Sequence, residues 1–169
     1  MEDKGKNLLD TCPQTDRSEN IQLKKYWVPP HVGTVKINVD AAFVSESGAS
    51  AVGVMARDHR GVVIAAMCRI IGNCRDAEEA ETVAILTGMQ LGIDLDMHVS
   101  ILESDCAAAV KAVNCSGVNL SETWSLFKEI GKAKTRLPDC VVSFTRRNLN
   151  SAAHELARIA LRSGDNNFV

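Results

Sequence analysis

The chain has 169 residues, 46% of them hydrophobic, and a formal net charge of −2 at pH 7. This length suits one domain with a sizeable core, and this hydrophobic fraction argues against wholesale disorder. The nearly neutral charge excludes a module that grips nucleic acid by overall charge alone, so any such contact must come from a local patch helped by metal ions.

Polar residues of mixed charge, without apolar periodicity, occupy positions 1–26, which we expect to form a flexible leader. Pro29 and Pro30 then favour an extended lead-in rather than a helix. From Val35 to Phe43, apolar residues alternate with mostly polar ones, the period of two that is typical of a strand. This segment is the first predicted strand.

Two further strands are expected over residues 51–57 and 62–71. Between them lies Asp58-His59-Arg60-Gly61, a good hairpin turn in which Gly61 is available for a positive φ. The first three strands are therefore expected to form an antiparallel meander.

Alternating helices and strands follow the meander. Asp76 is a candidate N-cap for a helix that ends at about residue 91 or 93. The remaining predicted elements are a strand over 99–103, helices over 106–113 and 121–134, a strand over 140–145 and a closing helix after residue 150. The order βββαβααβα predicts an α/β fold, with a five-stranded mixed sheet flanked by helices.

Three acidic residues carry most of the functional information. Asp40 lies toward the end of the first strand, Asp105 follows the strand over 99–103, and Glu81 lies in the first helix. Each has an ordinary alternative: a solvated strand face for Asp40, an N-cap for Asp105 and an acidic first turn for Glu81. Ligands of open α/β sheets bind outside the carboxyl ends of parallel strands, where Asp40 and Asp105 both lie if their strands are parallel neighbours.

The face of the first helix distinguishes Glu81 from its acidic neighbours. Ile85, Gly88 and Gly92 follow it at intervals of 4, 7 and 11 residues, a narrow face that lets a helix approach a sheet closely. Glu81 then points inward, and a buried carboxylate needs a cation, a metal ion or a proton. A divalent metal ion shared with Asp40 and Asp105 would supply that partner, which indicates metal-dependent phosphate chemistry.

Four sequence blocks form an ordered series around these acids and near the C-terminus. They are Lys36–Phe43, Glu79–Ala84, Glu103–Cys106 and Asn150–Ala157. In this order they resemble the motif blocks of ribonuclease H, especially the plant retroelement-derived domain found after a reverse transcriptase. The resemblance covers about residues 27–165, which implies one domain with a ribonuclease H-like fold there and a short tail over 166–169.

The resemblance implies an endoribonuclease that hydrolyses the RNA strand of an RNA–DNA hybrid by a two-metal-ion mechanism. Asp40, Glu81, Asp105 and His154 would be its catalytic and metal-binding residues, with two Mg²⁺ or Mn²⁺ ions as cofactors. Many relatives have an aspartate at the position of His154, and a neutral imidazole is a poorer Mg²⁺ ligand, so weakened activity and a structural role for His154 stay open. Ala41-Ala42 replaces the common Gly-Ser or Gly-Ala, which removes a possible hydroxyl contact to substrate.

The candidate nucleic-acid contacts are basic and amide side chains on the predicted hairpin and before the last helix: Arg57, Arg60, Arg146, Arg147, Asn148 and Asn150. For each arginine, ordinary solvated surface is the alternative. Arg146-Arg147 is the stronger pair, because it lies where the last predicted strand approaches the proposed site. The alternative to an enzyme is a non-catalytic, domesticated ribonuclease H-like module that binds nucleic acid or a partner protein.

The cysteines and the apolar runs indicate the compartment. The six cysteines are scattered without a Cys-x-x-Cys pair, so we expect small buried hydrophobes rather than a zinc site or disulfides. No apolar stretch is long enough to span a membrane, and no secretory apolar region follows Met1. We therefore expect an intracellular protein of the nucleus or cytoplasm that is not secreted and does not contact membranes. We also expect a monomer, and the resemblance implies that it binds an RNA–DNA hybrid.

Overall fold

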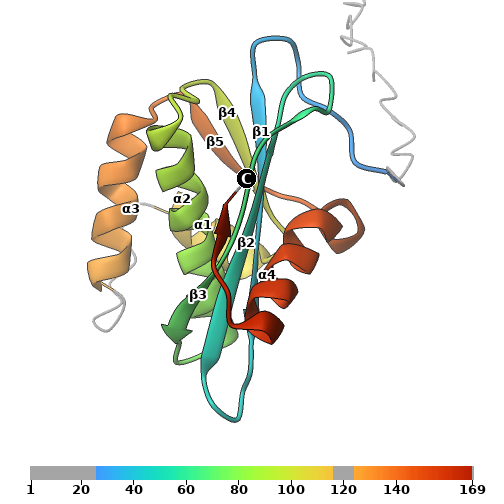
Figure 1. Ribbon diagram of the computed structural model, residues 1–169. Helices are drawn as coiled ribbons and strands as arrows, with labels where there is room; N and C mark the ends of the chain where they lie inside the picture. Colours follow the sequence, from blue (N-terminus) through green and yellow to red (C-terminus); the bar gives the residue numbers. More distant parts are fainter. Residues whose placement is uncertain (1–25, 116–123, 169) are drawn as a thin grey trace, which may run out of the picture.

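The structure is a computed structural model that describes residues 26–115 and 124–168. Within these residues, the centre is a mixed sheet of six strands in the order β5-β4-β1-β2-β3-β6 (Figure 1). The strands are β1 (Val35–Phe43), β2 (Ala49–Arg57), β3 (Val63–Asn73), β4 (Ser100–Ser104), β5 (Cys140–Phe144) and β6 (Asn167–Phe168). The helices are α1 (Ala77–Asp94), α2 (Ala107–Asn114), α3 (Trp124–Arg136) and α4 (Ser151–Ser163), with a 3₁₀ turn, η1 (Arg147–Leu149), before α4.

The strand pairing confirms the predicted meander and the predicted parallel neighbours. β1, β2 and β3 are successively antiparallel, whereas β1 pairs in parallel with β4, and β4 in parallel with β5. In the hairpin between β2 and β3, Gly61 has a φ of 80°, as expected, and its N–H donates to the carbonyl of Asp58. The carboxyl ends of β1 and β4 therefore lie at the same end of the sheet.

The predicted count of five strands is one too few. Asn167 and Phe168, which fall in the predicted tail, pair with β3 and form β6. The Asn166 side chain supports this pairing by accepting a hydrogen bond from the Ile70 N–H at 2.8 Å. Two residues carry no periodicity that could reveal a strand, so only the free edge of β3 makes them one. Part of the helix predicted over 121–134 lies outside the described residues, and α3 begins at Trp124.

Helices cover the two faces of the sheet unequally. α4 packs on β1, β2 and β3, and α1 packs on the opposite face, with α2 and α3 beside it (Figure 1). Gly88 of α1 lies so close to the sheet that an added Cβ would be 2.5 Å from Cγ1 of Val39. The predicted glycine-lined face of this helix is therefore the face that contacts the core. None of the helices within the described residues combines the length and the apolar character that crossing a membrane requires.

The segment before β1 is tied to the sheet by a polar network around Asn38, which is completely buried. Trp27 Nε1 and Arg57 Nη2 both donate to Asn38 Oδ1, at 3.0 and 2.8 Å, and Asn38 Nδ2 donates to Glu103 Oε2 at 3.0 Å. The Arg57 guanidinium also lies 3.6 Å from the centre of the Trp27 ring. The network joins the lead-in to three strands, β1, β2 and β4.

Truncating Trp27 is expected to destabilise the domain. Trp27→Phe keeps a ring for Arg57 but removes the indole donor, so we expect a loss of about 1 kcal/mol. Trp27→Ala also removes the stacking surface, and we expect a loss of about 3 kcal/mol in the free energy of unfolding. Urea denaturation measures both. Val32→Ala is the control, because Val32 is 82% exposed in the same lead-in; a Trp27→Ala midpoint equal to that of the control would contradict the network.

Candidate metal centre

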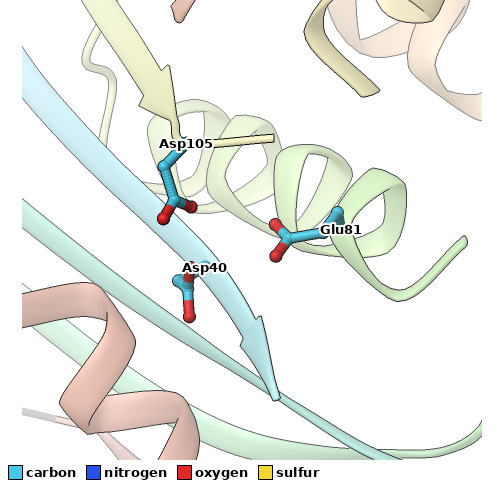
Figure 2. A group of neighbouring side chains, drawn as sticks. All are labelled: Asp40, Glu81 and Asp105. Carbon is cyan, nitrogen blue, oxygen red and sulfur yellow. The ribbon is translucent and has the colours of Figure 1, made fainter. Parts of the chain in front are cut away.

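Three carboxylates from distant parts of the chain meet at one end of the sheet. Asp40, Glu81 and Asp105 each offer an oxygen atom, and these three atoms lie within 4.8 Å of one another. Figure 2 shows the carboxylates directed toward one another from β1, from α1 and from the segment after β4. The predicted convergence of these side chains is confirmed.

The end of β4 creates the space for this cluster. Ser104, its last residue, pairs with Val39, so β1 has no parallel neighbour from Asp40 onward. The backbone N–H of Ala41 donates instead to the Glu81 carboxylate. The Glu81 side chain thus accepts the hydrogen bond that a neighbouring strand would otherwise accept from Ala41. This bond holds Glu81 beside Asp40.

The Asp105 side chain does not cap α2, because Cys106 is the N-cap, and it can therefore point toward the other two carboxylates. The N-cap of α2 is Cys106, whose Sγ accepts from the Ala109 N–H at 3.5 Å. Asp105 Oδ1 accepts from Asn150 Nδ2 at 3.3 Å. The alternative in which Asp105 is only a helix cap is therefore excluded.

The negative charges of the three carboxylates are unfavourable in the absence of a cation, and the pKa values of two of them are raised. Burial, together with the neighbouring Asp105, raises the pKa of Asp40 to about 7. Burial and the charges of Asp40 and Asp105 raise the pKa of Glu81 to about 8. Glu81 Oε2 is buried and has no hydrogen-bond partner. A hard divalent cation prefers carboxylate oxygens and would satisfy both the charge and this oxygen, so the residues present fit a metal ion.

The start of the last helix closes the site. Asn150 is completely buried, and its Nδ2 donates to the Val39 carbonyl at 2.8 Å as well as to Asp105. His154 Nδ1 lies 2.8 Å from Asp40 Oδ2, and Arg147 Nη2 lies 3.1 Å from His154 Nε2. His154 therefore contacts a member of the carboxylate group but does not belong to the group itself.

The predicted nucleic-acid contacts separate into two places. Arg146, Arg147 and Asn148 are exposed and lie just before α4, where Arg147 contacts His154. Arg57 pairs in register with Lys36 and Gly53 with Asp40, so Arg57 lies about 13 Å from Asp40 along the sheet. Arg60 lies farther along the same hairpin, where it pairs with Asp58.

Two of these residues have partners within the protein. Arg57 is occupied by Trp27 and Asn38, and its Nε is buried, so it stabilises the lead-in rather than presenting a free guanidinium. Asn150 is completely buried, and its side chain donates to the Val39 carbonyl. Nothing in the sequence distinguishes this asparagine from an ordinary helix cap, although its side chain makes no capping hydrogen bond.

The raised pKa values predict an unusual dependence of stability on pH in the metal-free protein. In the unfolded chain Asp and Glu lose their protons near pH 4, whereas folded Asp40 and Glu81 keep theirs up to about pH 7 and about pH 8. The folded state therefore binds more protons between these limits, so stability falls as the pH rises through this window. Each pH unit in this window is worth about 1.4 kcal/mol per group, so urea unfolding in EDTA should show a loss of several kcal/mol between pH 5 and pH 8.

Mg²⁺ should reverse this loss at pH 8 and have little effect at pH 5, because protons compete with the metal ion for the same oxygens. Asp58 and Asp76 have lowered pKa values, through hydrogen bonds from backbone and arginine donors, so their opposite effect on stability is complete by about pH 5 and does not change across this window. Glu81→Gln tests whether the carboxylate cluster causes the pH dependence. It removes one of the three neighbouring carboxylates, so stability should vary less with pH. An unchanged pH profile in this variant would contradict the crowding of the three carboxylates.

The comparisons with known proteins agree with this architecture. The model of a family described as reverse transcriptase-like matches residues 38–160. Among curated proteins, none is similar enough to count as a match.

Solved structures similar to this chain include several ribonuclease H domains. The N-terminal ribonuclease H domain of a Mycobacterium tuberculosis protein is 17% identical, with a TM-score of 0.69, and the match covers 77% of this chain and 94% of that one. Ribonuclease H1 of the archaeon Halobacterium salinarum is 20% identical, with a TM-score of 0.68 and coverage of 77% and 98%. A ribonuclease H1 isolated from compost by a metagenomic approach, solved with an RNA/DNA hybrid, gives the same four values. At these identities the likeness shows a shared fold.

Proposed function

Because the chain belongs to the reverse transcriptase-like family and has a ribonuclease H-like fold, we propose that it hydrolyses the RNA strand of RNA–DNA hybrids. The observation that carries this proposal is the group formed by Asp40, Glu81 and Asp105, with its buried and unpartnered Glu81 oxygen. The metagenomic ribonuclease H1 of the same fold was solved with such a hybrid, which supports this class of substrate.

In this proposal the three carboxylates hold two divalent metal ions, Mg²⁺ or Mn²⁺. Bound ions of this kind activate an attacking water and stabilise the leaving oxygen of an in-line displacement at phosphorus. The charge of three carboxylates on oxygen ligands suits these ions better than softer metals.

The residues of the chain prepare the site in three ways. The Ala41 N–H and the strand end at Ser104 place Glu81 beside Asp40, so the ligands are ordered before a metal ion binds. Asn150 joins Asp105 to the backbone of β1 and fixes the distance between the two aspartates. Arg146 and Arg147, exposed at the rim, supply positive charge for the phosphates that flank the scissile bond.

The experiment that tests this function compares substrates of equal sequence. The purified protein is incubated in Mg²⁺ with an end-labelled RNA–DNA hybrid, with an RNA–RNA duplex and with a DNA–DNA duplex. We expect cleavage of the RNA strand in the hybrid alone, leaving a 3′-hydroxyl and a 5′-phosphate. Binding of the hybrid without any cleavage would overturn the enzyme proposal and support a non-catalytic module.

A further inference from the structure

We propose that Arg147 and His154 form a relay of hydrogen bonds that fixes the orientation of Asp40, so that His154 is a positioning residue and not a metal ligand. The relay runs from Arg147 Nη2 to His154 Nε2 at 3.1 Å and from His154 Nδ1 to Asp40 Oδ2 at 2.8 Å. The inference rests on the metal site of the proposed function, but its geometry is a property of the chain alone.

The donors and acceptors of the relay allow one arrangement. A guanidinium group has only N–H donors, so His154 Nε2 must accept the hydrogen bond from Arg147 and carries no hydrogen. The ring hydrogen of the neutral imidazole is then on Nδ1, which donates to Asp40 Oδ2. Both ring nitrogens are engaged, and neither has a lone pair left for a metal ion.

The backbone around the relay is anchored at several points. η1 and the first turn of α4 bring Arg147 and His154 together, and the His154 N–H donates to the Asn150 carbonyl at 3.1 Å. Asn150 in turn donates to the carbonyl of Val39, the residue before Asp40. The side chain of Asp40 is 3% exposed and that of His154 21% exposed, so solvent competes little for the contact between them. Asn150 thus attaches the start of α4 to β1, the strand that also carries Asp40.

This arrangement has a consequence for metal binding. Asp40 Oδ2 accepts from the imidazole, so Oδ1 is the Asp40 oxygen that would be available to hold a metal ion together with Glu81 and Asp105. Partners of this kind orient ligating carboxylates, and their loss typically lowers metal affinity 10- to 100-fold.

The direct test is ¹⁵N NMR of the histidine-labelled protein, recorded without metal and at saturating Mg²⁺. We expect His154 to show the tautomer with hydrogen on Nδ1 in both states. In Arg147→Met the ¹⁵N resonance of Nε2 should shift because its hydrogen-bond donor is gone, while the hydrogen stays on Nδ1, which still donates to Asp40. A His154 that carries its hydrogen on Nε2 in the Mg²⁺-loaded protein would overturn the proposal, since Nδ1 would then be free to bind the ion.

Calorimetric titration with Mg²⁺ provides the second measurement. His154→Ala should lower the affinity about tenfold. Arg147→Met also removes a positive charge near the cluster, so its effect must be read as a double-mutant cycle with His154→Ala. We expect the two changes to be coupled, and strictly additive effects would contradict the relay.

The two proposals fail in distinguishable ways. If wild-type protein binds no Mg²⁺, the proposed function fails, while the tautomer of His154 in the metal-free protein still tests the relay. Circular dichroism of each variant identifies loss of folding, and the wild-type NMR measurement does not depend on any variant.

Discussion

Replacing Asp40 with asparagine is expected to lower the rate of hybrid hydrolysis by about a thousandfold. At an effective dielectric constant of 20, two unit charges 4 Å apart interact by about 4 kcal/mol, and a barrier higher by 4 kcal/mol slows a reaction about 10³-fold. Asparagine has nearly the same shape as aspartate but cannot supply this charge. Asp40 is buried at the centre of the carboxylate group, so solvent cannot compensate for the loss.

The same substitution should leave the fold intact. The pKa of Asp40 is raised to about 7 because its charge is unfavourable in the metal-free site, and asparagine removes that charge. Asp40→Asn should therefore melt at the wild-type temperature or above it in EDTA at pH 8, although it is inactive in Mg²⁺.

A fluorescent hybrid assay with proteins purified in parallel measures the effect. Asp139→Asn makes the same chemical change at an exposed residue before β5, and its rate should equal that of the wild type. EDTA should abolish cleavage by both active proteins. If Asp40→Asn cleaved the hybrid as fast as the wild type, the activity would not come from this site.

Replacing Gly53 with alanine is expected to destabilise the domain by about 3 kcal/mol or more. Gly53 lies on β2 directly beneath α4, where an added Cβ would be 2.5 Å from the backbone nitrogen of Ala157 and 2.7 Å from Leu156 Cβ. It would also overlap the carbonyl oxygen of Ala153. Because these neighbours include helix backbone, relief requires α4 to move, and overpacking of this kind commonly costs about 1–3 kcal/mol, occasionally more.

The change would also reach the site, since α4 carries His154 and Gly53 pairs with Asp40 in register. Urea denaturation measures the loss of stability. Gly131→Ala is the matched control: Gly131 is exposed on α3 with no atom within 4 Å of an added Cβ. That variant should gain up to about 1 kcal/mol, because alanine favours helix over glycine. Equal midpoints for Gly53→Ala and the wild type would contradict the close approach of α4 to β2.

Most elements of the fold could be predicted because their signals are local. The alternation from Val35 to Phe43, the turn at Gly61 and the cap at Asp76 each depend on neighbours within a few residues, and the structure confirms all three. The two-residue β6 could not be predicted in this way, since its pairing with β3 brings together residues about 100 positions apart.

The candidate site also has features that the sequence predicts and features that only the tertiary structure shows. The positions of Asp40 within the first strand and Asp105 after its parallel neighbour, with the glycine-lined face of the helix that carries Glu81, were sufficient to predict the meeting of the three carboxylates. The role of Cys106 as the cap of α2 was not predictable, because Asp105 is by type the better capping residue. The Asp105 carboxylate instead accepts a hydrogen bond from Asn150, which lies 45 residues away in the sequence.

Residue pattern alone thus specifies the first five strands, the helices and an acidic, oxygen-rich site toward the carboxyl end of β1, because periodicity and capping act over a few residues. The packing of α4 on the meander settles how the site is completed: Asn150 is buried against Val39, and His154 binds Asp40 across 114 positions. No local preference encodes these contacts, since each exists only when a helix formed at the end of the chain reaches a strand formed near its beginning.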